Sequence, residues 1–97
     1  MRGWVLESTD PELTLRLPVG VVKTLGRTAR ADFIVDAALV SRIHCRLTAK
    51  AQDQLVVEDL GSTNGTLVNG QRVDRTILRT GDVLTVGRVA FTVTPAD

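Results

Sequence analysis

Alternation of apolar and polar residues with a period of two dominates this chain and favours folds built from β-strands. Nine segments follow the pattern, and turn-forming pairs such as Asp10-Pro11, Asn69-Gly70 and Gly81-Asp82 stand between them. No window carries the apolar stripe at i, i+3, i+4 and i+7 that an amphipathic helix needs. We expect strands near residues 4–8, 13–19, 21–26, 32–36, 44–49, 54–60, 66–70, 83–87 and 89–93. Many short strands at close spacing predict an all-β, antiparallel β-sandwich or a barrel.

The length of 97 residues suits one domain, residues 1–97, with a single hydrophobic core. The net charge of +1 gives no general attraction to nucleic acid, and the acidic residues are interspersed with the basic ones. The N-terminal stretch lacks the apolar segment of a signal peptide, and no apolar run reaches membrane-spanning length. We therefore expect no nucleic-acid or membrane partner and a cytoplasmic location, or a nuclear one if the organism is eukaryotic.

The single cysteine, Cys45, excludes a disulfide within the chain and a cysteine-based zinc site. No other metal-ligand spacing is present, so we expect neither a metal nor a cofactor. Trp4, Phe33 and Phe91 are the only aromatic residues, and they fall on apolar positions that predict core packing. Cys45 is predicted to pack inward as a small hydrophobic side chain. Pro95 argues against a further central strand near the C-terminus.

Three predicted loops concentrate polar groups of one kind. They are "LGRTARADF" at residues 25–33, "LVSRIHC" at 39–45 and "DLGSTNGT" at 59–66. Together they offer guanidinium groups, hydroxyls, a side-chain amide and backbone made permissive by glycine. These groups are hydrogen-bond donors that suit a phosphate group. None of them is a strong nucleophile unless a neighbouring base activates it.

The order of these motifs resembles the forkhead-associated (FHA) domain. Gly26-Arg27, then Ser41-Arg42-x-His44, then Asn64-Gly65 each stand at the end of a predicted strand. The surrounding stretches "DFIVDAALVSRIHCRL", "VEDLGSTNGTLVNGQRV" and "LRTGDVLTVG" also follow the family's pattern, so that the resemblance covers residues 21–93. It implies an FHA/SMAD-like sandwich of about eleven short strands, whose loops at one apex bind phosphothreonine peptides.

The resemblance implies a role for each matching residue. Arg27 corresponds to the arginine that contacts the phosphate, and Ser41 to the hydroxyl that donates to it. Thr63 matches a second hydroxyl position, and Asn64 matches the residue that holds the peptide backbone. Arg42 joins the phosphate site in some members. The alternative for Arg42 is a structural ion pair with an acidic neighbour such as Asp36 or Asp59.

Four further residues match positions that shape the loops. Gly26, His44 and Gly65 are among them, and we expect the His44 imidazole to bond loop backbone and to hold Ser41 in place. Asn69-Gly70 is expected to form an ordinary hairpin turn. In some family members this asparagine also braces the binding loops. Peptide preference is expected to depend on side chains around residues 29–31, 37–39 and 71–75.

The function implied is that of a signalling adaptor that reversibly binds phosphothreonine in partner proteins, which are products of a Ser/Thr kinase. The alternative is an FHA-fold module for phosphate-independent assembly. An enzyme is not expected, because His44 and Cys45, as strand neighbours, would point to opposite faces. The chain also lacks a nucleophile-elbow or phosphate-loop motif. Thr9, which lies beside acidic residues, is a candidate regulatory phosphorylation site.

Overall fold

The computed structural model describes residues 2–96, which contain eleven strands and no helix. The strands are β1 (Gly3–Thr9), β2 (Glu12–Pro18), β3 (Val22–Gly26), β4 (Phe33–Ile34), β5 (Cys45–Ala51), β6 (Gln54–Asp59), β7 (Thr66–Val68), β8 (Gln71–Val73), β9 (Arg75–Leu78), β10 (Val83–Val86) and β11 (Val89–Ala96). They form a six-stranded sheet in the order β2-β1-β11-β10-β7-β8 and a five-stranded sheet in the order β4-β3-β5-β6-β9.

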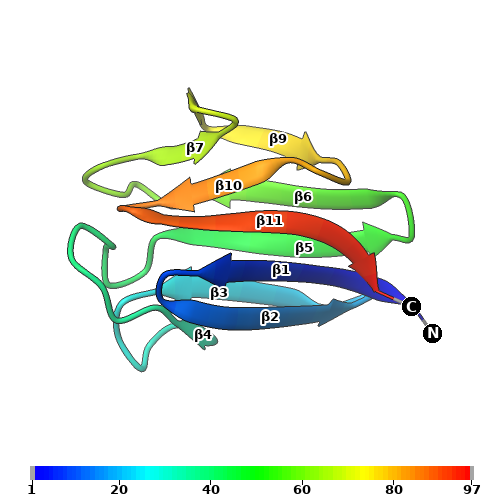
Figure 1. The fold of residues 1–97 in the computed structure, drawn as a ribbon, viewed down its shortest axis with the longest axis horizontal. Helices are drawn as coiled ribbons and strands as arrows, with labels where there is room; N and C mark the ends of the chain where they lie inside the picture. The colour runs from blue at the N-terminus through cyan, green and yellow to red at the C-terminus, as the bar shows by residue number, and fades with distance from the viewer. Residues whose placement is uncertain (1, 97) are drawn as a thin grey trace.

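The two sheets stack face to face, with one in front of the other in Figure 1. Neighbouring strands are antiparallel except for β3 and β4, which are parallel. The inward-facing side chains of both sheets form one apolar cluster, in which Phe91 and Leu47 are fully buried. Of the aromatic residues, Trp4 and Phe91 are buried and Phe33 packs against the cluster. The predicted all-β sandwich of about eleven strands is confirmed.

The prediction from local sequence patterns was wrong for three strands. Residues 32–36 were expected to be extended throughout, but only Phe33–Ile34 pair with a neighbour. The alternation did not indicate β8 or β9, and the stretch 71–75 was expected to be loop. A strand of three or four residues contains too few alternations to stand out from a turn. Pairing with β7 and with β6 specifies these two strands instead.

Pro95 lies within β11, which runs between β1 and β10, so the expectation of no central strand there is wrong. The backbone N–H and C=O of Val93 bond to Asp82 and Gly81, on the β10 side of β11. Two residues further on, the ring nitrogen of Pro95 faces that same side, but β10 pairs only as far as Thr92. Proline is tolerated here because its missing N–H costs no ladder hydrogen bond.

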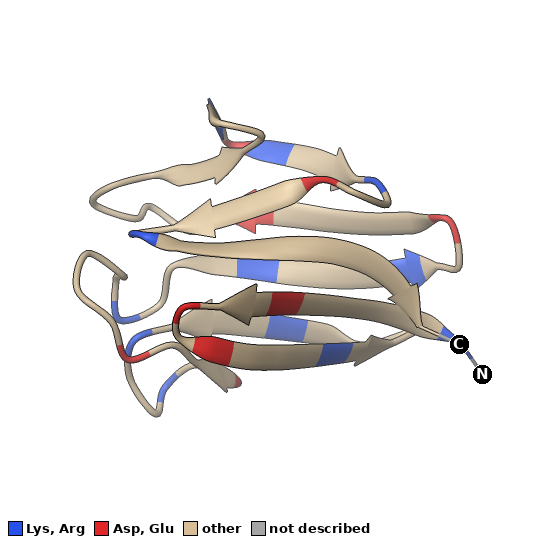
Figure 2. Cartoon of the chain, in the orientation of Figure 1, with Lys and Arg blue, Asp and Glu red and all other residues tan. Residues whose placement is uncertain are grey.

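The topology brings three loops to one end of the sandwich, at the left of Figure 1. They are residues 27–32 after β3, residues 35–44 before β5 and residues 60–65 between β6 and β7. Figure 2 shows basic and acidic residues interspersed over both sheets and these loops. No helix long and apolar enough to span a membrane occurs among residues 2–96.

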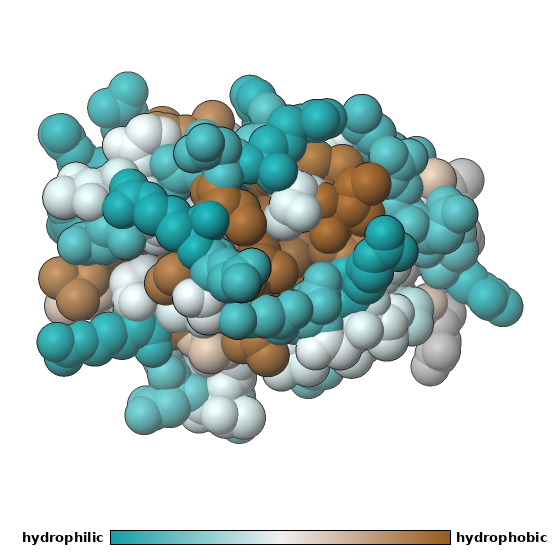
Figure 3. Space-filling view, turned by 90° about the horizontal axis from the view of Figure 1, so that it is seen from above, coloured by the Kyte–Doolittle hydropathy of each residue, from teal (hydrophilic) through white to brown (hydrophobic). Residues whose placement is uncertain are grey.

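Figure 3 shows the molecule from above, so that it faces the edge of the sandwich at which Figure 1 shows β7, β9 and β10. Apolar side chains gather in the middle of this face and hydrophilic ones surround them. Ile77 of β9 is one of four large hydrophobic side chains that are exposed among residues 2–96. This edge is separate from the loop end, because none of its strands contributes to the groove described below.

Replacing Phe91 with alanine should destabilise the fold strongly, because the ring is fully buried between the sheets. We expect a loss of about 3–5 kcal/mol in the free energy of unfolding. Urea unfolding followed by Trp4 fluorescence measures it. The matched control is Ala90→Ser, on the exposed face of the same strand, with an expected change within about 0.5 kcal/mol. Equal effects of the two substitutions would contradict this account of the core.

Candidate functional site

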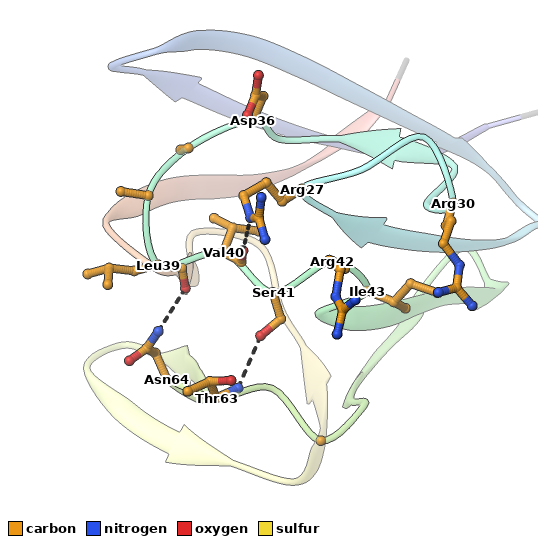
Figure 4. A pocket seen from close by; sticks show the side chains of 13 residues that line it. Arg27, Arg30, Asp36, Leu39, Val40, Ser41, Arg42, Ile43, Thr63 and Asn64 are labelled. Carbon is orange, nitrogen blue, oxygen red and sulfur yellow. Dashed lines mark hydrogen bonds between the residues drawn. The ribbon is translucent and has the colours of Figure 1, made fainter.

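The three loops enclose an open groove of about 1010 Å³ (Figure 4). It is lined by Arg27 and Arg30 from the first loop, residues 36–43 from the second, and Gly61, Thr63 and Asn64 from the third. Five residues predicted to contact the ligand thus line one groove: Arg27, Ser41, Arg42, Thr63 and Asn64. Of the segments expected to set peptide preference, Arg30 and residues 37–39 line the groove, whereas residues 71–75 do not.

Arg27 follows β3 directly and is fixed at both its backbone and its side chain. Its backbone N–H donates to the carbonyl of Ser41 at 2.9 Å, and its Nε donates to the carbonyl of Val40 at 2.9 Å. The two terminal amino groups of the guanidinium make no hydrogen bond to any residue of 2–96. Two parallel donors are therefore held in the groove, in the geometry that binds two oxygens of one anion.

Ser41 and Thr63 come from different loops and are joined by a hydrogen bond. The backbone N–H of Thr63 donates to Oγ of Ser41 at 3.1 Å, as the dashed line in Figure 4 shows. A hydroxyl oxygen that accepts one bond keeps its proton free to donate. The Ser41 hydroxyl can thus donate to a ligand, and Thr63 adds its exposed side chain to the groove beside it.

His44 is fully buried beneath these loops. Its Nδ1 accepts a hydrogen bond from the backbone N–H of Ser41 at 3.1 Å, and its Nε2 lies 2.9 Å from the carbonyl oxygen of Gly65. Because the amide can only donate and the carbonyl can only accept, the ring is the neutral tautomer with its proton on Nε2. The ring thus links the backbone of Ser41 to the backbone of Gly65.

Two glycines allow the loops to approach this closely. A Cβ on Gly26 would lie 2.2 Å from the carbonyl oxygen of Arg42, so no other residue fits without moving the backbone. Gly65 has a φ of +87°, and a Cβ there would lie 2.8 Å from Nε of Arg72. At both positions a larger residue would require the backbone or Arg72 to move.

Asn64 ties the third loop to the second. Its Nδ2 donates to the carbonyl of Leu39 at 3.1 Å, and Leu39 adopts a left-handed conformation with a φ of 70°. One amide hydrogen and the acceptor Oδ1 of Asn64 remain available. These two groups could pair with an N–H and a C=O of an extended peptide lying in the groove.

Arg42 is exposed and lines the groove. The ion pair proposed as its alternative role, with Asp36 or Asp59, is not formed. The salt bridges found among residues 2–96 join Arg46 and Arg75 to Glu58 instead. The Arg42 side chain is therefore available to a ligand.

Asn69 lies apart from the groove. Asn69 and Gly70 both have positive φ, 52° and 83°, and form the hairpin turn between β7 and β8 that Asn-Gly predicts. The Asn69 side chain donates to the Asp82 carboxylate at 3.0 Å and accepts from the N–H of Val83 at 2.9 Å. It braces the start of β10 and not the groove loops, because it stands at the end of β7 away from them.

Sequence reasoning missed the structural role of Asp59. This carboxylate accepts hydrogen bonds from the hydroxyls of Ser62 and Thr66 and from the backbone N–H groups of Gly61 and Ser62. Partial burial alone would raise the pKa of Asp59, but these bonds outweigh it and the pKa is lowered. The carboxylate thereby orders the loop that carries Thr63. An Asp followed closely by Gly-Ser is an Asx-turn pattern that could have indicated it.

The Cys45 thiol is fully buried at the start of β5. Desolvation, together with the nearby negative charge of Asp59, raises its pKa to about 12. The thiol form therefore persists at neutral pH, and Cys45 acts as the small core side chain that was predicted. No cluster of three or more potential metal ligands occurs among residues 2–96.

A two-sheet, all-β fold with an arginine- and hydroxyl-lined groove at its loop end defines a ligand-binding β-sandwich. Residues 23–87 match the family model described as FHA domain, which is more than half of the chain. The chain belongs to the FHA domain family. A solved structure from work on phosphothreonine-dependent FHA domain interactions superposes with a TM-score of 0.85 at 33% identity, covering 94% of this chain and 94% of that one.

Two curated relatives are from Mycobacterium tuberculosis. The ABC transporter ATP-binding/permease protein Rv1747 is 40% identical over 77 residues, which is 79% of this chain and 9% of that protein. The glycogen accumulation regulator GarA is 36% identical over 67 residues, which is 69% of this chain and 41% of GarA. The chain thus spans less than half the length of either relative.

Asp59→Asn should make the free energy of unfolding depend less on pH in the acid range. A carboxyl group with a lowered folded-state pKa contributes stability that is complete above its unfolded pKa, near 3.8. That contribution is lost as the pH falls through the lower, folded-state pKa. The stability difference between wild type and Asp59→Asn should therefore shrink as the pH falls from about 6 to about 2.

Urea unfolding across this pH range measures the difference. The carboxylates of Asp32 and Glu58, whose pKa values are also lowered, titrate in both proteins, so their contributions cancel. If the difference in the free energy of unfolding between the two proteins stays constant over this range, the hydrogen bonds of Asp59 do not favour its charged form.

The Cys45 thiol should resist modification in the native protein. We expect negligible reaction with a thiol reagent at mildly alkaline pH, because the group is both buried and protonated. In urea the same thiol should react fully, which serves as the control. Rapid modification without unfolding would contradict the burial of Cys45.

Proposed function

We propose that this chain is a phosphothreonine-binding adaptor domain, spanning residues 1–97, that recognises phosphorylated partner proteins reversibly and catalyses no reaction. One observation carries the proposal. The Arg27 guanidinium is anchored through Nε, and its two free amino groups share the groove with the Ser41 hydroxyl, which is free to donate. Membership of the FHA domain family supports it.

The phosphate group fits these donors chemically. A phosphothreonine carries about −1.5 to −2 charges and three strong acceptor oxygens. The two amino groups of Arg27 can bind two of the oxygens, and Ser41 can donate to the third. Thr63 and Arg42 line the same groove and supply further donors. A planar guanidinium suits this role better than an ammonium group, which acts as a point charge.

The strength of such a contact suits signalling. Two or three charge-assisted hydrogen bonds, at about 1.5–3 kcal/mol each, contribute about 3–9 kcal/mol. That range corresponds to affinities from about millimolar to submicromolar. Binding would therefore be reversible on removal of the phosphate, as an adaptor requires.

The peptide around the phosphothreonine would lie extended in the groove. Asn64 offers one amide hydrogen and Oδ1 to its backbone, while its other amide hydrogen is bonded to Leu39. The bonds of Ser41, His44 and Asn64 already hold the loops together without ligand. A groove formed in advance loses less conformational entropy on binding, which supports useful affinity from a short peptide.

Partners and location follow from the same chemistry. Phosphothreonine is made by Ser/Thr kinases, which use ATP and therefore act in the cytoplasm, or in the nucleus of a eukaryotic cell. We place the chain there. The proposal includes no catalytic step, because both ring nitrogens of His44 are bonded and the Cys45 thiol is buried and protonated.

Calorimetric titration with a pool of phosphothreonine peptides and its unphosphorylated twin tests the proposal. Only the phosphorylated pool should bind. Arg27→Ala should weaken binding at least about a hundredfold, since two charge-assisted bonds at about 1.5–3 kcal/mol each are lost. Arg79→Ala, an exposed arginine outside the groove, is the matched control and should bind as wild type does.

Two different results would contradict the proposal. Equal binding of the two pools would indicate a module for phosphate-independent assembly, the alternative that the fold also permits. Phosphate-dependent binding that survives Arg27→Ala would keep the class of ligand but overturn the assigned site.

A further inference from the structure

We propose that two copies of this chain pair through the free edge of β2, in a symmetric dimer with one continuous sheet. β2 is the end strand of the six-stranded sheet and bonds only to β1. It forms the lower border of that sheet in Figure 1. An end strand of seven residues is a ready template for another strand, because one row of its backbone groups has no partner.

The pairing of β1 with β2 shows which backbone groups face the free edge. The N–H of Val19, directly after β2, donates to the carbonyl of Arg2 at 3.0 Å. Antiparallel strands alternate between bonded and non-bonded pairs, so the three leucines of β2 bond to β1, whereas Glu12, Thr14 and Arg16 face the edge. No other backbone hydrogen bond among residues 2–96 involves these three residues.

The charges along this edge complement those of a second copy. In a symmetric antiparallel pair centred on Thr14, Glu12 of each copy lies opposite Arg16 of the other. Both side chains are exposed on the outer face of the sheet. They are the only charged residues of β2, one at its start and one towards its end, as Figure 2 shows. The pairing therefore forms two opposite-charge pairs, which stabilise a sheet.

The same charges, together with Pro18, favour the register centred on Thr14. Centring the pair on Glu12 or on Arg16 would place like charges opposite each other. Centring it on Leu15 would place Glu12 opposite Pro18, which faces the edge but has no N–H to donate. The register centred on Thr14 leaves Pro18 outside the paired segment and uses the N–H and C=O of all three edge-facing residues.

Leu13 adds an apolar contact at this edge. It is half-buried, whereas Leu15 and Leu17, which face inward from the same strand, are buried. In the proposed register, Leu13 of each copy lies opposite Leu15 of the other, so pairing removes its apolar surface from water. β2 also lacks the inward-pointing charge and the bulge that keep many end strands single.

The phosphothreonine groove proposed above stays open in such a dimer, because no residue of β2 lines it. β2 runs along the length of the sandwich, and the loops lie at one end of it (Figure 1). Antiparallel pairing of two β2 strands therefore points the two loop ends in opposite directions. The dimer would present one groove at each of its ends.

Sedimentation equilibrium of the full chain tests the pairing. Between about 10 µM and 500 µM, a range suited to a small interface, the average mass should rise from that of one chain towards that of two. Thr14→Pro should abolish this rise. The proline ring removes an N–H that faces the free edge, and it removes no bond to β1.

Charge reversal tests the register. Glu12→Arg and Arg16→Glu should each weaken self-association about tenfold or more, because symmetry turns both charge pairs into like-charge pairs. Both positions are exposed, so the fold should not change. An equal mixture of the two variants should associate as the wild-type chain does, since each supplies the charges that the other lacks. Arg79→Glu, an exposed reversal after β9 in the other sheet, is the matched control and should associate normally.

A wild-type chain that remains monomeric over the whole range would overturn the proposal. Association that survives Thr14→Pro would overturn it too, because the contact would then lie elsewhere. If the wild-type chain associates but the mixture of the two reversed variants does not, the register centred on Thr14 is wrong. No phosphopeptide is present in these measurements, so their outcomes are independent of the proposed function.

Discussion

The buried imidazole of His44 is the contact on which the geometry of the groove depends. Its two nitrogens join the backbone of Ser41 to the backbone of Gly65, and so connect two loops that come from different parts of the sequence. The ring is fully buried, so its loss would leave an N–H and a carbonyl without partners. Ser41 can present its hydroxyl to the groove because this bridge fixes its position.

The other contacts in the groove extend the same arrangement. Asp59 orders the loop that includes Thr63, Asn64 ties that loop to Leu39, and Arg27 is anchored to Val40. Arg27 and Asn64 each use one donor in these bonds and leave at least one other donor free. The groove is therefore held by its own residues while it still offers hydrogen-bonding groups to a ligand, which is how a preformed site limits the entropic cost of binding.

Sequence patterns were sufficient for the class of fold and for most residues of the groove. The motifs around Arg27, Ser41 and Asn64 each stand at a strand end, and the topology brings those ends together. The strands β8 and β9 were not predicted because they are too short to show a clear alternation of apolar and polar residues. The links made by Asp59 depend on how the loop folds in space, and no periodicity in the chain indicates them.

A crystal structure of the chain with a bound phosphothreonine peptide would show where the phosphate binds and whether the loops move. We expect the phosphate to lie between the terminal amino groups of Arg27 and the hydroxyl of Ser41. It also predicts that the bonds of His44 to Ser41 and Gly65, and that of Asn64 to Leu39, persist unchanged. A phosphate bound elsewhere, or loops that rearrange and break the His44 bridge on binding, would contradict a groove formed in advance for this ligand.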